Sequence, residues 1–264
     1  MALHESGGNG KAVLVTSNAI WKVGTLPQIP KELSKYLPSG DAREWMTDVL
    51  AGLKAVRIAE GTEFRLESAD VLGGTQWNRD VKLANVPITG AGGLVMTNCT
   101  PGYTFRATVV AANNTATGEA KAVCGTGGDT TTLLFSDGAN WAGTVVADNV
   151  ALTNVTDGAA AATVNFGSLR MDGEFPVRIW ATTNDMVNIA TSLQNGGGDF
   201  RPVLMPGRTE LEPGESFTFG TFAAGATFPR RIGHWILSST PAANPDFVTV
   251  SLRYMPPATR ILLR

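Results

Sequence analysis

The stretch that most constrains the fold is Thr130–Asn154, with the sequence TTTLLFSDGANWAGTVVADNVALTN. It predicts three short strands, Thr131–Phe135, Gly143–Val146 and Val150–Thr153, because β-branched residues are frequent in these runs and Asp, Gly and Asn stand between them. The runs are too short for helices, and they follow one another too closely for strands joined by helical crossovers. The stretch therefore predicts an all-β chain that turns every few residues.

Similar segments recur over most of the chain, separated by Asn, Gly and Asp residues. Because the strands are short and clean two-residue hairpin turns are scarce, the pattern favours a parallel β-solenoid, in which successive coils stack. A β-sandwich is the alternative that the same spacing allows. The further expected strands include Tyr103–Ala111, Glu119–Cys124, Ala162–Phe166, Phe175–Trp180, Met186–Ala190, Phe200–Met205, Trp235–Ser239 and Phe247–Tyr254.

One amphipathic helix is predicted over Asp41–Val56. Asp41 and Glu44 have the spacing of a capping box, and an apolar stripe with helical spacing includes Trp45 and Val49. Such a helix must bury its stripe, and we expect it to cap the open end of the β structure. A partner-binding helix is the alternative.

This pattern divides the chain into four parts. Residues 1–10 are expected to be a disordered or artificial tail, and residues 11–57 to hold an N-terminal strand and the capping helix. Residues 58–205 are expected to form the solenoid core, and residues 206–264 to add C-terminal strands that close it.

Charge and hydropathy exclude several classes of partner. The net charge is −2, with 21 basic and 23 acidic residues, which gives no electrostatic reason to expect nucleic acid as a partner. No apolar run is long enough for a membrane-spanning helix. The low content of charged residues, 17%, favours an extracellular or cell-surface protein whose export signal has been removed. An intracellular location is the alternative.

The two cysteines, Cys99 and Cys124, are 25 positions apart. This spacing is close to one coil of a solenoid, which would place them about 4.8 Å apart, within the range of a disulfide. The alternative is that both are small buried apolar residues. Without paired histidines they do not predict a zinc site.

Residues 113–180 contain the segments NNTATGEAKA, TTLLFSDGANWAGTVVADNVALTN and ATVNFGSLRMDGEFPVRIW. This region resembles the β-helical passenger regions of autotransporter-like surface proteins from bacteria, which stack segments of the type LxFxxGANWxGTVVAxNVxLTN. The resemblance implies a right-handed parallel β-helix that is exported to the cell surface. It also implies an adhesive or structural role more often than a catalytic one.

Few side chains suggest chemistry. Trp141 and Trp180 are either core or corner aromatics or exposed platforms for sugar rings. His4 and His234 are expected to be structural or surface residues, and no motif of a serine hydrolase or a zinc protease is present. Polysaccharide lyases and hydrolases use clustered carboxylates, and calcium sites do likewise. The turn residues that could contribute to such a cluster are Asp137, Asp148, Asp157, Asp172 and Asp185.

The sequence therefore predicts a structural or adhesive surface solenoid that is not an enzyme, with no catalytic, cofactor-binding or metal-binding residues. Stacked coils leave strand edges at their ends, so self-association into oligomers or filaments is plausible. In such a stack, asparagine side chains at the corners can form ladders with backbone groups. The alternative function is carbohydrate recognition or cleavage, including a tailspike-like role with surface glycans as partners. Aromatic platforms beside adjacent carboxylates in one groove would favour that alternative.

Overall fold

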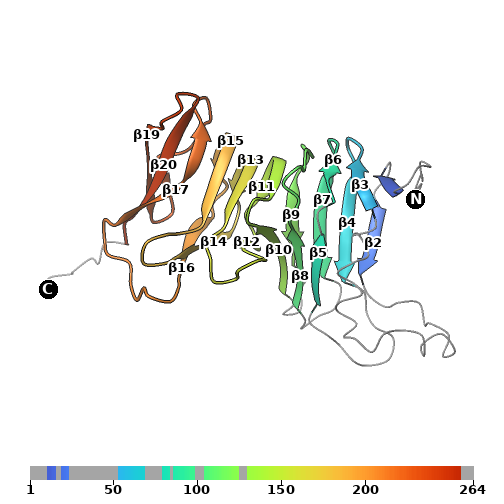
Figure 1. The fold of residues 1–264 in the computed structure, drawn as a ribbon, viewed down its shortest axis with the longest axis horizontal. Coiled ribbons are helices and arrows are strands. Elements are labelled where there is room, and N and C mark those ends of the chain that lie inside the picture. Colours follow the sequence, from blue (N-terminus) through green and yellow to red (C-terminus); the bar gives the residue numbers. More distant parts are fainter. Residues whose placement is uncertain are drawn as a thin grey trace, which may run out of the picture.

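The computed structural model describes residues 11–15, 19–23, 53–68, 79–83, 86–98, 104–124 and 130–256. They form an elongated row of strands and contain no helix (Figure 1). The strands are β1 (Lys11–Val15), β2 (Ala19–Val23), β3 (Leu53–Ile58), β4 (Glu63–Ser68), β5 (Arg79–Leu83), β6 (Ile88–Thr89), β7 (Gly93–Asn98), β8 (Thr104–Val109), β9 (Ala120–Val123), β10 (Thr130–Ser136), β11 (Asn140–Val146), β12 (Val150–Thr153), β13 (Thr163–Met171), β14 (Glu174–Ile179), β15 (Met186–Asn195), β16 (Asp199–Leu204), β17 (Ser216–Ala223), β18 (Arg231–Ile232), β19 (Trp235–Pro241) and β20 (Phe247–Tyr254).

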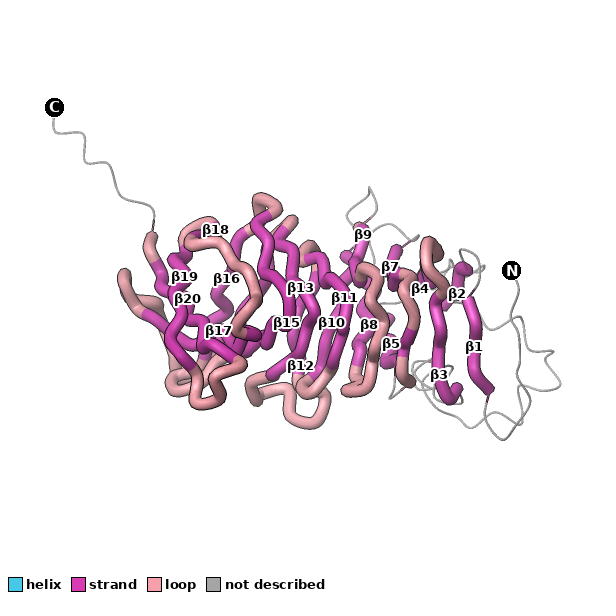
Figure 2. The backbone as a smooth tube through the Cα atoms, turned by 90° about the horizontal axis from the view of Figure 1, so that it is seen from above, coloured by secondary structure: helices cyan, strands magenta, loops and turns pink. Residues whose placement is uncertain are grey.

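Strands that are distant in sequence pair in parallel, which confirms the β-solenoid. The main sheet contains β2, β4, β7, β9, β11, β13, β15 and β17 as successive parallel neighbours. A second sheet has the order β12-β10-β8-β5, and the chain passes from one sheet to the other as each coil is added (Figure 2). Because β10 lies between two parallel partners, β8 and β12, the sandwich alternative is wrong for this part of the chain. The right-handed sense of the coil stays a prediction.

The register of the main sheet shows the length of a coil. Val145 pairs with Leu169, which is 24 residues later, and Leu169 pairs with Leu193 after a further 24. Near the N-terminus the step is longer, since Phe64 pairs with Leu94. Equivalent positions of successive coils therefore lie directly above one another, about 4.8 Å apart.

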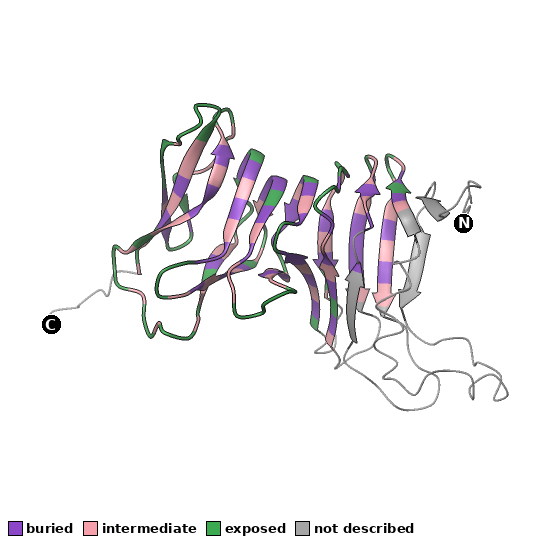
Figure 3. Ribbon diagram, in the orientation of Figure 1, coloured by how far each residue is buried: buried purple, intermediate pink, exposed green. Residues whose placement is uncertain are grey.

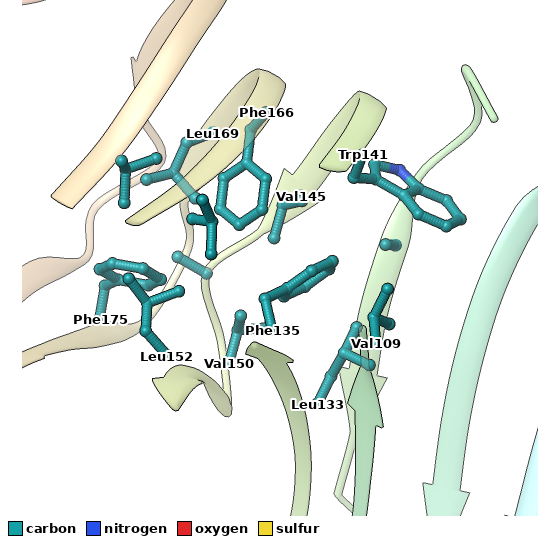
Figure 4. Close-up of a cluster of buried hydrophobic side chains, with 14 of the residues drawn as sticks. Val109, Leu133, Phe135, Trp141, Val145, Val150, Leu152, Phe166, Leu169 and Phe175 are labelled. Atoms are coloured by element: carbon teal, nitrogen blue, oxygen red, sulfur yellow. The ribbon is translucent and has the colours of Figure 1, made fainter. Parts of the chain in front are cut away.

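Inward side chains form one apolar core along the stack. Along β8 and β12 buried residues alternate with less buried ones, as expected for strands with one buried face (Figure 3). Phe135 and Phe166 meet edge to face with 4.8 Å between their ring centroids (Figure 4). Such contacts join one coil to the next, because the two rings come from different sheets and different coils.

A column of glycines lets successive coils approach closely. It consists of Gly92, Gly118, Gly143 and Gly167, which are 24 to 26 residues apart. A Cβ at each of the last three positions would overlap a backbone oxygen of the preceding coil. The main sheet has a register shift at the same place, between Trp141 and Thr144. Glycine is therefore required here by the close backbone contact.

The sheet changes character at its C-terminal end. β17 pairs in parallel with β15 at Ile189 and Phe222, but it pairs antiparallel with β20. β20 and β19 then form an antiparallel pair, and β18 adds a short edge strand. The strands predicted at Trp235–Ser239 and Phe247–Tyr254 are confirmed. We call β17–β20 the antiparallel unit.

The predicted helix Asp41–Val56 is wrong over its last residues. Leu53–Val56 belong to strand β3, in which Val56 pairs with Val13 of β1 and with Ile88 of β6. Parallel partners on both sides outweigh the local helical periodicity. The rest of the predicted helix, and the predicted tail at residues 1–10, lie outside the described residues.

Candidate functional site

Trp141 is a core aromatic, which confirms the first of its two interpretations, and its role as a carbohydrate platform is wrong. Its side chain has 0% exposure and lies in the core, and its Nε1 donates a hydrogen bond of 2.9 Å to the carbonyl oxygen of Gly118 in the preceding coil. The indole therefore joins two coils through both packing and a buried hydrogen bond. No face of the ring is left for a ligand.

Trp180 lies at the end of β14 and is half-buried. The guanidinium carbon of Arg178 lies 5.2 Å from the centroid of its ring, within the range of a cation–π contact. This contact holds the ring in place and occupies one of its faces. A role for Trp180 as a carbohydrate platform stays a prediction.

Arg178 is itself held by a buried ion pair. Its Nε and Nη2 donate to the two carboxylate oxygens of Asp185, at 2.8 and 2.9 Å, and Asp185 is 1% exposed. The same carboxylate accepts the backbone N–H groups of Arg178 and of Ala162 in the preceding coil. All of these bonds fix the corner between β14 and β15, so Asp185 is a structural carboxylate.

The other four turn aspartates also take part in hydrogen bonds or ion pairs within the fold. Asp137 accepts the backbone N–H of Thr163 at 2.7 Å, and Asp157 that of Ala159 at 2.9 Å. Asp148 accepts a hydrogen bond from the side-chain amide of Asn149, and Asp172 forms an ion pair with Arg170 at 2.9 Å. Among the described residues no group of three or more His, Cys, Asp or Glu is arranged to hold a metal ion. The five aspartates are not brought to one site.

His234 pairs with Asp199 across the junction between the stack and the antiparallel unit. Its Nδ1 lies 2.7 Å from Oδ2 of Asp199, and the His234 side chain is 47% exposed. The pair fastens the turn between β18 and β19 to the start of β16. His4 lies outside the described residues.

The predicted disulfide involves one residue outside the described part of the chain, Cys99. The thiol of Cys124 is half-buried and lies 3.4 Å from the backbone nitrogen of Thr131, which donates to it. A bond between the two cysteines stays a prediction.

An ionic ladder crosses several coils of the main sheet. Lys121 contacts Glu63 at 3.3 Å and Glu119 at 3.8 Å, and Arg170 contacts Glu119 at 2.6 Å. The hydrogen bond from Arg65 lowers the pKa of Glu63, with Lys121 adding to the effect against partial desolvation. The hydrogen bond to Glu119 raises the pKa of Arg170. The ladder is therefore a set of paired charges, with Arg65 and Asp172 at its ends.

A three-residue pattern recurs in the main sheet, and sequence reasoning missed it. It consists of a polar residue, a large apolar residue and a small residue, and each middle residue pairs with the equivalent residue of the next coil. The middle residue is buried, so its two neighbours face outward. The four copies are Asn140-Trp141-Ala142, Asn165-Phe166-Gly167, Asn188-Ile189-Ala190 and Thr221-Phe222-Ala223.

The outward residues of this pattern line a groove of about 450 Å³, which we call the asparagine groove. Asn188 donates from Nδ2 to Oδ1 of Asn165 at 3.0 Å, and its own Oδ1 accepts the backbone N–H of Thr221 at 2.9 Å. Asn140 donates to the carbonyl oxygen of Asn114. This ladder lies on strands, whereas the sequence predicted asparagine ladders at corners. At one such corner, Oδ1 of Asn114 accepts the backbone N–H of Ile88. Phe247 also lines the groove.

A second groove, of about 380 Å³, lies over the other sheets and is lined by Asp148 and Glu174 among others. Glu174 pairs with Arg201 at 3.1 Å, and both side chains are exposed. No aromatic side chain lines this groove, and no carboxylate lines the asparagine groove. Neither of these two grooves therefore combines an aromatic platform with adjacent carboxylates.

Comparisons with protein-family models, with curated proteins and with solved structures found no match to the chain. None of the described segments forms a helix that is long and apolar enough to cross a membrane.

Proposed function

We propose that this chain is a structural or adhesive β-solenoid displayed at a bacterial cell surface, where it holds a long, rigid flank away from its anchor. The observation that carries this proposal is the register of the main sheet, in which each strand from β4 to β15 pairs in parallel with the strand of the next coil. Such a stack has one continuous core and grows in a single direction.

The use of polar side chains also supports a structural role. Asp185 and the asparagines of the main sheet bond from one coil to the next, and the ionic ladder joins coils that are two steps apart. These groups stiffen the stack and are not gathered into a reactive centre. The resemblance of residues 113–180 to autotransporter passengers supports the right-handed coil, the surface location and the absence of enzymatic activity.

Labelling of intact cells tests the proposal. Antibodies raised against residues 104–256 should label intact producing cells, and deletion of the gene should reduce adhesion or cell–cell aggregation. Labelling that appears only after permeabilisation would contradict the surface location. Unchanged adhesion and aggregation in the deletion strain would contradict the adhesive role.

Self-association is part of the same proposal, and sedimentation of the purified full chain measures it. We expect the sedimentation coefficient to rise with protein concentration, because strand edges at the ends of a solenoid can pair with other copies. A concentration-independent monomer would contradict this part of the proposal and leave the surface location intact.

A further inference from the structure

The asparagine groove has features that the structural role does not require. Phe247 begins β20, where it pairs with Ala223 of β17, and its side chain is 39% exposed. It therefore stands beside the outward small residues of the recurring pattern. Since Ala142, Gly167 and Ala190 carry little or no side chain, they leave a trough next to the asparagine column.

The lining of the groove favours a neutral ligand. None of the residues that line it is ionisable. A charged group placed there would lose hydration without gaining an ion pair, which is costly. The charged side chains of the ionic ladder, which lie on the same sheet, are already paired with one another.

The asparagines retain hydrogen-bonding capacity toward a ligand. Nδ2 of Asn165 and Oδ1 of Asn140 form no hydrogen bond with another described residue, so Asn165 keeps a donor and Asn140 an acceptor. An amide can both donate and accept, as recognition of hydroxyl groups requires. The column repeats these groups about every 4.8 Å along the stacking axis. A ligand with regularly repeated hydroxyls fits this arrangement.

We propose that the asparagine groove binds a neutral oligosaccharide whose chain runs along the stacking axis. The asparagine amides bond its hydroxyl groups, and Phe247 packs against the apolar face of one sugar ring. This binding role goes beyond the structural proposal and does not depend on where the protein is located.

Calorimetric titration of the purified full chain tests the proposal. The probes are the neutral hexasaccharides cellohexaose, xylohexaose, mannohexaose and chitohexaose, with hexagalacturonate as the charged comparison. We expect at least one neutral probe to bind. Phe247→Ala should weaken its binding about tenfold, because stacking on an aromatic ring is lost. Asn165→Ala should weaken it about fivefold through the loss of hydrogen bonds.

Two further kinds of variant make the test specific. Ala190→Arg places a long side chain in the groove from an exposed position, and it should abolish binding while the protein stays folded. The matched controls are Leu204→Ala, an exposed apolar residue on β16, and Asn113→Ala, an exposed asparagine outside the groove. Binding by both controls should stay within about twofold of the parent, as expected for surface changes that touch no ligand.

Three results would overturn the proposal. The first is that no neutral probe binds, or that hexagalacturonate binds more tightly than all of them. The second is that binding is unchanged in Phe247→Ala and Ala190→Arg. The third is that the protein self-associates and that Ala190→Arg abolishes this association, which would show that a second copy of the chain covers the groove.

Discussion

The parallel stack and the antiparallel unit pair their strands in different ways. In the stack, the partner of a strand lies a full coil away, as with Val145 and Leu169. In the antiparallel unit, β19 and β20 are joined by a short loop and pair directly. Yet each part uses a tryptophan as an anchor. Trp141 and Trp235 are both buried, and each donates its indole N–H to a carbonyl oxygen of the preceding coil.

The difference shows what each arrangement demands of the sequence. Stacked coils bring backbones into contact at fixed positions, which is why the glycine column exists. The antiparallel unit joins the stack through the parallel pairing of β17 with β15, and also through side chains, including Trp235 and the pair of His234 with Asp199. It ends in a strand of two residues, β18, so this end offers a shorter edge to another chain than the five residues of β2 at the other end of the sheet. A substitution in the stack should therefore destabilise the stack as a whole, whereas a substitution in the antiparallel unit should destabilise mainly that unit.

The largest expected effect contrasts one polar side-chain pair in each region. Asp185→Ala should lower the free energy of unfolding by about 4 kcal/mol, because it leaves Arg178 without its carboxylate in a mostly buried corner. His234→Ala, which breaks the exposed pair with Asp199, should cost about 0.5 kcal/mol. Urea denaturation measures both values. Equal losses of unfolding free energy in the two variants would show that burial of the side-chain pair does not determine its contribution to stability.

The glycine column offers the next test. Gly143→Val should destabilise the protein by about 3 kcal/mol, because the new side chain would collide with the backbone of the preceding coil. The matched control is Gly158→Val, at a position where a Cβ meets no atom within 4 Å, and it should change stability by about 0.5 kcal/mol or less. A Gly143→Val protein as stable as the control would contradict close coil contact.

The two tryptophan anchors allow the same substitution in both regions. Trp141→Phe and Trp235→Phe each remove one buried hydrogen bond and should cost about 2 kcal/mol. Hydrogen exchange should differ, however. We expect Trp141→Phe to reduce protection on both sides of β11, and Trp235→Phe to reduce it mainly over β17–β20. A global loss of protection in Trp235→Phe would show that the two regions unfold as one unit.

The smallest effects concern acid stability. Hydrogen bonds from Arg65 and Arg208 lower the pKa of Glu63 in the stack and of Glu215 in the antiparallel unit, respectively. A carboxylate whose pKa is lowered by folding stabilises the fold at pH values above its pKa in the unfolded chain, which is about 4.5. This contribution is lost as the pH falls through the pKa of the folded state.

Glu63→Gln and Glu215→Gln should therefore each lose about 0.5 kcal/mol at pH 7, and the difference from the parent should shrink toward pH 3. Thermal melts between pH 7 and pH 3 measure this change. A difference that grows on acidification would contradict the lowered pKa values.

Local signals were sufficient to predict the strands and the solenoid. Turn residues such as Asp137-Gly138 separate runs of β-branched residues, and Gly138 indeed has a φ of +76°. The start of β3 was assigned to the helix because Leu53 and Val56 continue its apolar spacing, and pairing with β1 and β6 makes these residues part of a strand. Burial of Trp141 also depends on the coil beneath it, which its own surroundings in the sequence do not reveal.

The groove and the glycine column were harder to predict, although the sequence contains a signal for both. Asn140, Asn165 and Asn188 are 25 and 23 residues apart, so the repeat has no fixed period. The copies of the three-residue pattern share only the size and polarity of their residues. An alignment of the chain to itself that allows coils of variable length would find this repeat, because each copy must fit the same position in the main sheet.

The pairing of β10 tests the central claim most directly. Cross-strand nuclear Overhauser effects between backbone protons should connect residues 131–135 with residues 105–109 on one side, in parallel register. On the other side they should connect residues 133–136 with residues 150–153. Antiparallel contacts between residues 131–135 and 141–146, the next strand along the chain, would contradict the solenoid and the surface role proposed for it.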